Sequence, residues 1–197
     1  MRIGTHFNAT VRFRTLALRT AVCVLLGWCA PTGLSLAQSE SLDETDTRAI
    51  MKANFLFHFA ASNEWPASSK NGNFNVAVIG NERLFEELVD KYAFKLVGAQ
   101  PLKIHAFDDV KSFNGASEMH LVYCDPGGDA LSSLAKTLDG RPALLVADSE
   151  GALERGAFIN FVAVGNRIRY QINAEQAREK GVLIGNKIMS WAVTSTP

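Results

Sequence analysis

Four acidic residues are the side chains best placed for chemistry in this sequence. Asp125 and Asp129 follow one predicted strand, and Asp148 and Glu150 follow another. Open α/β sheets place ligand sites at the carboxyl ends of their strands, and carboxylate oxygens are ligands that magnesium prefers. Each of these acids also suits a turn or a helix cap, which is the commoner use of such residues. The pattern therefore favours ordinary turn acids, with a metal site as the alternative.

The other candidates for catalysis lack a second group at the required spacing. His58, His105 and His120 do not have the spacing typical of zinc ligands. Ser149 lacks the G-x-S-x-G context of a nucleophile elbow. We therefore predict no catalytic residue, no metal and no cofactor, and a hydrolytic enzyme is the least favoured function.

A predicted strand over residues 167–172 carries two arginines on one face. Alternation places Arg167 and Arg169 opposite an apolar face that should meet the core. Arginines on such a face are most often solvated, but they also suit the polar rim of a protein interface. In that second interpretation, three residues nearby in sequence extend the rim: Glu154, Arg155 and Arg178.

Two residues suit either the core or a partner. Trp65, which precedes Pro66 at a predicted helix end, is a core side chain or an interface anchor. Cys124 ends an apolar strand and is expected to be buried, as free cysteines usually are. If its thiol is exposed, a link between Cys124 residues of two chains is the alternative.

Residues 1–37 have the pattern of a cleavable secretory signal. The segment contains Arg2, Arg12, Arg14 and Arg19, then an apolar run over residues 20–30, then Ser35-Leu36-Ala37. The run is too short for a bilayer-spanning helix, which needs about 20 residues. We predict cleavage near Ala37, a periplasmic domain over residues 38–197, and no direct membrane insertion after cleavage.

Loss of this segment would change the charge and cysteine content of the chain. The remainder keeps 16 Lys and Arg against 20 Asp and Glu, a net charge of −4. Such a balance argues against nucleic acid and anionic membrane as partners. Cys124 alone remains of the three cysteines, so an internal disulfide cannot form. About 160 residues suffice for one domain with a core.

Apolar periodicity predicts alternating helices and strands. A capping box at residues 41–44 predicts a helix that ends near Asn63, and Asp129 and Asn173 are predicted to cap later helices. Gly165-Asn166 predicts a hairpin turn. Strands are predicted over residues 74–79, 102–107, 120–124, 143–147, 157–164 and 167–172. The fold class is α/β: a single compact domain with a mixed β-sheet, helices on both faces, and a C-terminal β-hairpin.

Seven segments together carry a resemblance to a known family: residues 52–60, 64–66, 76–80, 145–151, 155–161, 167–173 and 177–184. In these segments the chain resembles the YfiR family of periplasmic proteins. Their order and spacing cover nearly the whole predicted mature chain. Two departures are present: Ala157 replaces a second glycine of the family pattern, and the chain cannot form the internal disulfides of some relatives.

The resemblance implies a non-catalytic regulator that is often dimeric. Relatives bind the periplasmic sensor region of an inner-membrane diguanylate cyclase, which lowers cyclic di-GMP and biofilm formation, and an outer-membrane lipoprotein sequesters them. We expect the same function here, with a homodimer as the expected state. The alternative is a small-molecule-binding accessory domain for a membrane sensor such as a histidine kinase, with a pocket near Gly80, Cys124 and Asp148.

Overall fold

The computed structural model describes residues 34–113 and 118–193, with side chains from Glu44 onward. The predicted signal lies outside the described residues except for residues 34–37. The helices are α1 (Leu34–Ser62), the short 3-10 helix η1 (Ala67–Ser69), α2 (Glu82–Tyr92), α3 (Gly128–Thr137), α4 (Ala174–Glu179) and α5 (Asn186–Trp191). The strands are β1 (Phe74–Ile79), β2 (Leu96–Val97), β3 (Gln100–Phe107), β4 (Leu121–Cys124), β5 (Leu144–Ala147), β6 (Ile159–Val164) and β7 (Arg167–Ile172).

The strands of the described residues form one mixed sheet in the order β2-β3-β1-β4-β5-β6-β7. The five central strands are parallel, while β2 and β7 are antiparallel edge strands. The chain leaves β1 for β3 on one side and returns to β4 on the other. The sheet therefore has a switch point between β1 and β4, where open α/β folds commonly place their sites.

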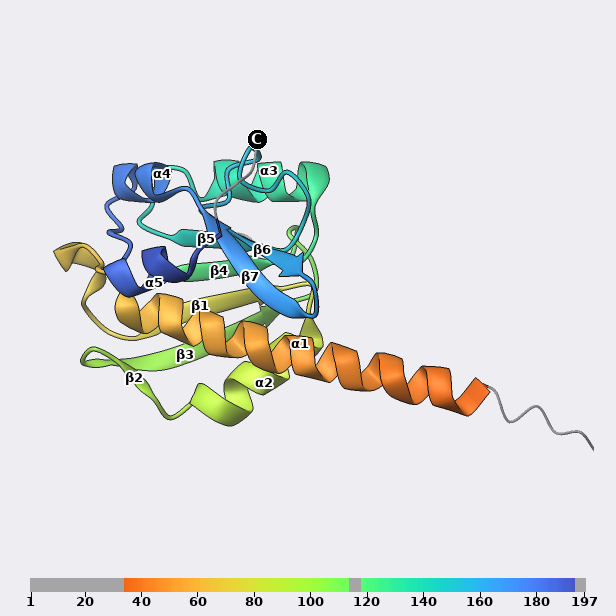
Figure 1. Cartoon of the computed structure of the whole chain (residues 1–197). Helices are drawn as coiled ribbons and strands as arrows, with labels where there is room; N and C mark the ends of the chain where they lie inside the picture. The colour runs from red at the N-terminus through yellow and green to blue at the C-terminus, as the bar shows by residue number, and fades with distance from the viewer. Residues whose placement is uncertain (1–33, 114–117, 194–197) are drawn as a thin grey trace, which may run out of the picture.

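Helices cover both faces of the sheet, as predicted (Figure 1). Helix α1 packs against α2, α5 and β7, and α3 and α4 lie on the other side. Helix α2 connects β1 to β3 and α3 connects β4 to β5, so the two crossovers run in opposite directions along the sheet. Right-handed crossovers in opposite directions place their helices on opposite faces.

Helix α1 begins earlier than predicted. It already runs from Leu34, so residues 41–44 lie inside it and cannot cap it. The predicted start was wrong because residues 34–40 contain no glycine or proline to interrupt the helix. The predicted end near Asn63 is confirmed, since α1 ends at Ser62.

Local capping decides where the later helices begin. The Asn81 side chain accepts a hydrogen bond from the Leu84 N–H at 2.9 Å, which starts α2 directly after β1. The predicted Asn173 cap of α4 is confirmed, since its side chain accepts from the Gln176 N–H at 3.1 Å. The predicted Asp129 cap was wrong: α3 is capped at Gly127, and Asp129 lies in its first turn, where its charge suits the helix dipole.

Candidate functional site

Asp125 follows β4 at the carboxyl edge of the sheet, beside the switch point. Its Oδ1 accepts a hydrogen bond from the Tyr123 hydroxyl at 2.7 Å and another from Asn81 Nδ2 at 2.9 Å. Asn81 follows β1, and its other side-chain atom caps α2. These bonds join the end of β4 to the turn after β1.

Lys52 of α1 reaches the same edge from the face of the sheet that α1 covers. It is only 7 % exposed, pairs with Asp148 Oδ2, and donates to the Tyr123 hydroxyl at 3.1 Å. We call Lys52, Asn81, Tyr123, Asp125 and Asp148 the carboxyl-edge network. It connects α1 with the residues that follow β1, β4 and β5.

Tyr123 is the centre of the carboxyl-edge network and remains protonated. Burial raises the pKa of its phenol, and the nearby charges of Asp125 and Asp148 raise it further. A neutral phenol can donate to Asp125 while accepting from Lys52. Because both carboxylates already have partners, the geometry suits a clamp that holds α1 on the sheet.

The four predicted acids do not form one cluster. Asp125 and Asp148 are linked through Tyr123 and Lys52, whereas Asp129 lies in α3. Glu150 follows Asp148, and its carbonyl accepts a hydrogen bond from Arg155 at 2.7 Å. Within the part of the chain that the structure describes, no three His, Cys, Asp or Glu side chains group as metal ligands do.

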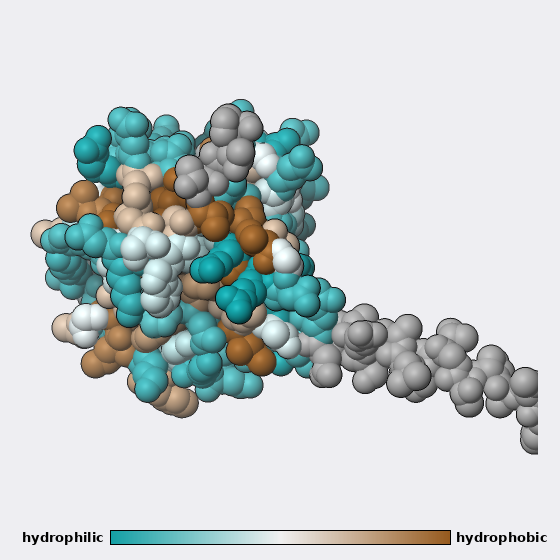
Figure 2. All heavy atoms as spheres, viewed as in Figure 1, coloured by the Kyte–Doolittle hydropathy of each residue, from teal (hydrophilic) through white to brown (hydrophobic). Residues whose placement is uncertain are grey.

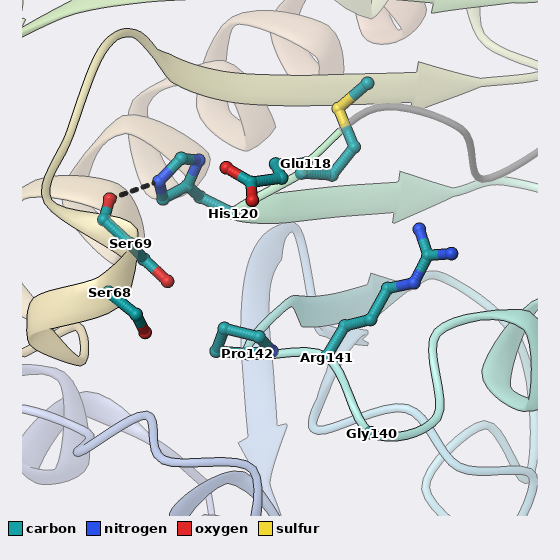
Figure 3. Close-up of a pocket in the computed structure, with 8 residues that line it drawn as sticks. Ser68, Ser69, Glu118, His120, Gly140, Arg141 and Pro142 are labelled. Atoms are coloured by element: carbon teal, nitrogen blue, oxygen red, sulfur yellow. Dashed lines mark hydrogen bonds between the residues drawn. The ribbon is translucent and has the colours of Figure 1, made fainter.

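The histidines are also separated. His58 lies on α1, while His105 and His120 contact Asn75 on β1 from two directions: His105 Nε2 lies 3.3 Å from its Oδ1, and His120 Nδ1 accepts from its N–H at 3.1 Å. At the amino edge of the sheet, His120 Nε2 points to the Ser69 carbonyl at 2.7 Å (Figure 3). Both ring nitrogens of His120 are therefore engaged, which favours a structural role.

The proposed pocket near Gly80, Cys124 and Asp148 is divided. Asp148 lines a cavity of about 370 Å³, and Gly80 lines another of about 340 Å³. Cys124 has no exposed surface and lines neither cavity. The first cavity also contains Arg48, Ser149, Glu150, Asn160, Phe161, Val162, Ala163 and Ile168. The expectation of one pocket at all three residues does not agree with these two cavities, which share no lining residue.

The Cys124 thiol is inaccessible. It donates to the Pro126 carbonyl at 3.2 Å, and burial, together with the charge of Asp125, raises its pKa to about 12. A link between two chains requires an exposed thiol, which this conformation does not provide. The expectation of burial is therefore the one that agrees with the structure.

Trp65 lies in the core. It is 5 % exposed, its Nε1 donates to the Ala60 carbonyl at 3.1 Å, and its ring meets Phe74 and His120 edge-on. As one of the predicted partner residues, Trp65 is unavailable for direct contact in this conformation. It holds the end of α1 against the start of β1.

The predicted charged residues lie on separate elements. Arg167 and Arg169 share one face of the edge strand β7, opposite the buried Ile168 and Tyr170. Glu154 and Arg155 lie in the turns after β5, where the Arg155 guanidinium donates to two backbone carbonyls. Arg178 lies on α4, 3.8 Å from Glu175. They thus come from three separate segments of the chain: the turns after β5, strand β7 and helix α4.

A surface between α4 and α5 exposes large apolar side chains that the sequence analysis did not single out. Leu183, Met189 and Trp191 are 47 %, 43 % and 44 % exposed. A groove of about 450 Å³ is lined by Leu183, Met189, Ala174, Glu175, Arg178 and Ile184. Figure 2 shows apolar side chains in this region, between α4 and α5. We call Arg178, Leu183 and Met189 the α4–α5 surface. Trp191 is exposed on another side of α5, because residues two apart on a helix do not share a face.

Lys52 was also missed, although a signal for it exists. It lies four residues before Leu56 and seven before Phe59, so it falls on the buried stripe of α1. A lysine on such a stripe needs a carboxylate partner, because burying an unpaired charge is costly. The apolar residues of the α4–α5 surface gave no comparable signal, since short apolar helices are usually buried.

Comparison with known protein families identifies the family of the chain. The model of the YfiR/HmsC-like family matches residues 49–193, which include the carboxyl-edge network and the α4–α5 surface. No protein of curated function matches the chain. None of the helices in the described residues is sufficiently long and apolar to cross a membrane.

Proposed function

The chain belongs to the YfiR/HmsC-like family, and from this premise we propose that it is a non-catalytic periplasmic protein that restrains an inner-membrane diguanylate cyclase. The family comprises periplasmic regulators of such cyclases. In this proposal the domain follows a signal cleaved near Ala37, binds the cyclase's periplasmic sensor region, and lowers cyclic di-GMP and biofilm formation. A homodimer and sequestration by an outer-membrane lipoprotein are part of the same proposal.

The observation that carries the proposal is the α4–α5 surface. Exposed apolar patches with a polar border are typical of protein interaction sites, and Trp and Arg are enriched among the residues that dominate such interfaces. Leu183 and Met189 supply the apolar part, and Arg178 with Glu175 supplies a charged border. In this proposal the partner would reach the other predicted charged residues only if it extended beyond the α4–α5 surface. These residues are Glu154, Arg155, Arg167 and Arg169.

Restraint of a cyclase requires unequal binding to its two states. A regulator shifts an equilibrium only by the difference between its affinities for the inactive and active forms. Each tenfold difference corresponds to about 1.4 kcal/mol. The clamp between α1 and the sheet supports this function by keeping the domain rigid, so that binding energy is not lost in ordering it.

Deletion and complementation test the proposal. Loss of the gene should raise cyclic di-GMP and biofilm formation, and the unchanged protein should restore both. Leu183→Asp with Met189→Asp should fail to restore them while the purified protein keeps its fold and melting temperature. Ile50→Asp is the matched control, since Ile50 is an exposed apolar residue on α1. Unchanged cyclic di-GMP after deletion would exclude the cyclase as target.

Crosslinking in cells identifies the partner directly. A photoreactive residue at Met189 should capture a diguanylate cyclase or its sensor region, identified by mass spectrometry. Capture of a histidine kinase would retain the regulatory function but move its output away from cyclic di-GMP.

A second candidate, a ligand-binding accessory domain, is favoured by the cavity beside Asp148. That cavity combines Arg48 and Glu150 with an apolar wall at the carboxyl edge, where α/β folds often bind small molecules. A metabolite that binds the folded state raises the melting temperature. A broad screen without any such rise would count against this candidate.

A further inference from the structure

The turn between α2 and β2 holds a phenylalanine wholly in solvent. Phe94 is 100 % exposed, and Leu96, two residues later, is 57 % exposed. The turn is firmly held: the Lys95 N–H donates to the Tyr92 carbonyl at 2.9 Å, and the Leu102 N–H donates to the Lys95 carbonyl at 3.1 Å. Tyr92 is buried and stacks on Phe57. The exposure of Phe94 is therefore fixed by its surroundings.

Two lysines lie beside these apolar side chains, and a third lies on a loop next to the start of β3. Lys95 lies between them in sequence, and Lys103 shares a strand face with Pro101, the pairing partner of Leu96. Lys70 lies on the adjoining loop, because Gln100 Nε2 donates to the carbonyls on either side of it, those of Ser69 and Asn71. We call Lys70, Phe94, Lys95, Leu96 and Lys103 the β2-edge patch.

The β2-edge patch is locally positive. Lys70, Lys95 and Lys103 form no ion pair with any residue that the structure describes. Asp90, in the last turns of α2, is the nearest acid in sequence to Phe94. The pKa of His105 on β3 is lowered by burial and also by the charge of Lys103, which agrees with a positive local potential.

We propose that the β2-edge patch contacts the surface of an anionic phospholipid bilayer. Phe94 and Leu96 enter the interfacial layer, where aromatic rings are favoured, and the lysines lie at the level of the headgroup phosphates. Basic residues beside exposed apolar ones are the combination that holds peripheral proteins on anionic membranes. No helix crosses the bilayer in this arrangement.

A second copy of the chain fits this patch less well. A twofold contact across the β2 edge would bring Lys95 and Lys103 of both copies together, and such like-charge contacts are unfavourable. An anionic lipid surface is complementary to the same charges. The mature chain has a predicted net charge of −4, which would repel an anionic membrane. At physiological salt, however, screening reduces electrostatic interactions beyond about 8 Å, so the charges close to the contact matter most.

The position of the patch is compatible with partner binding. Strand β2 is at one edge of the sheet, whereas α5 packs against β7 at the opposite edge (Figure 1). A domain resting on the bilayer through β2 would therefore leave the α4–α5 surface free. This inference does not depend on the proposed cyclase partner.

Vesicle sedimentation of the purified protein tests the proposal. The protein should bind vesicles of phosphatidylethanolamine with phosphatidylglycerol, and should bind phosphatidylcholine vesicles far less, with binding that falls as salt rises. Phe94→Ser should lower the partition coefficient about tenfold. Lys95→Gln with Lys103→Gln should lower it about thirtyfold. Lys136→Gln, an exposed lysine on α3, is the matched control and should change nothing.

Three outcomes would overturn the proposal. Equal binding to both kinds of vesicle, or equal losses with Lys136→Gln, would show that the patch does not recognise anionic lipid. Conversion of a dimer to a monomer by Phe94→Ser, measured by light scattering, would assign the edge to self-association. Capture of an acidic protein by a photoreactive residue at position 94, without lipid binding, would assign it to that partner. Unchanged melting temperatures would show that the variants are folded.

Discussion

The buried ammonium of Lys52 on α1 and the carboxylate of Asp148 after β5 form an ion pair that fixes a helix to the carboxyl edge of the sheet. The pair is completed by the Tyr123 hydroxyl, which accepts from Lys52 and donates to Asp125. Helix α1 also packs against α2, α5 and β7, so the ion pair is one of several contacts that hold the helix in place.

Replacement of Lys52 should destabilise the protein. Lys52→Met removes one partner of the pair and leaves Asp148 near buried surface, so we expect a loss of about 2 kcal/mol in the free energy of unfolding. Arg48→Met is the control, because the Arg48–Glu44 pair is exposed and should contribute less than about 1 kcal/mol. Urea denaturation measures both, and equal losses would contradict the clamp.

The Cys124 thiol should be unreactive in the folded protein. Its pKa, raised to about 12, leaves almost no thiolate at neutral pH, and the side chain is buried. Reaction with a thiol reagent should proceed only as fast as the protein unfolds. Val164→Cys, at an exposed hairpin position, should react at once. Rapid modification of Cys124 itself would show that its thiol is accessible, and a Cys124–Cys124 link between two chains would then be possible.

Acid should destabilise the fold through His105. Its pKa is lowered in the folded state by burial and by Lys103 from an ordinary value of 6.5. The unfolded chain therefore binds protons more readily, and the contribution of the neutral ring is present above pH 6.5 and lost as the pH falls through the lowered pKa. His105→Gln should reduce the slope of stability against pH in this range. An unchanged slope would assign the acid sensitivity to other groups.

Gly185 should not tolerate a side chain. A Cβ there would lie 2.1 Å from the Ser62 carbonyl oxygen, so Gly185→Ala should cost about 2 kcal/mol through forced movement of the chain. Gly140→Ala meets open space and has only the strain of its positive φ of 73°, so its loss should be smaller. Thermal unfolding compares the two, and equal losses would contradict the close approach.

Arg178 should matter for binding and little for stability. Its pair with Glu175 is exposed, so Arg178→Ala should change the free energy of unfolding by less than about 0.5 kcal/mol. If the α4–α5 surface binds a partner, the same change should lower the affinity, measured by calorimetry with the captured sensor region. Arg141→Ala, outside this surface, is the control.

The sequence predicted most strands and turns because their signals are local. Residues 74–79 and 167–172 have the predicted bounds, and Asn173 caps α4 as expected. Strand β2 was missed because two residues are too few to show alternation. The start of α1 was misplaced because a capping motif can occur within a continuing helix.

By itself the sequence determined the α/β class, the mixed sheet with its terminal hairpin, and membership of the family. Periodicity shows which side of each element is apolar, and turn residues show where elements end. Only the tertiary structure decided which residues meet: Lys52 with Asp148, Trp65 with Phe74. It also decided that Leu183, Met189 and Phe94 remain exposed. The reason is physical, since an apolar side chain has the same local pattern whether or not another element covers it.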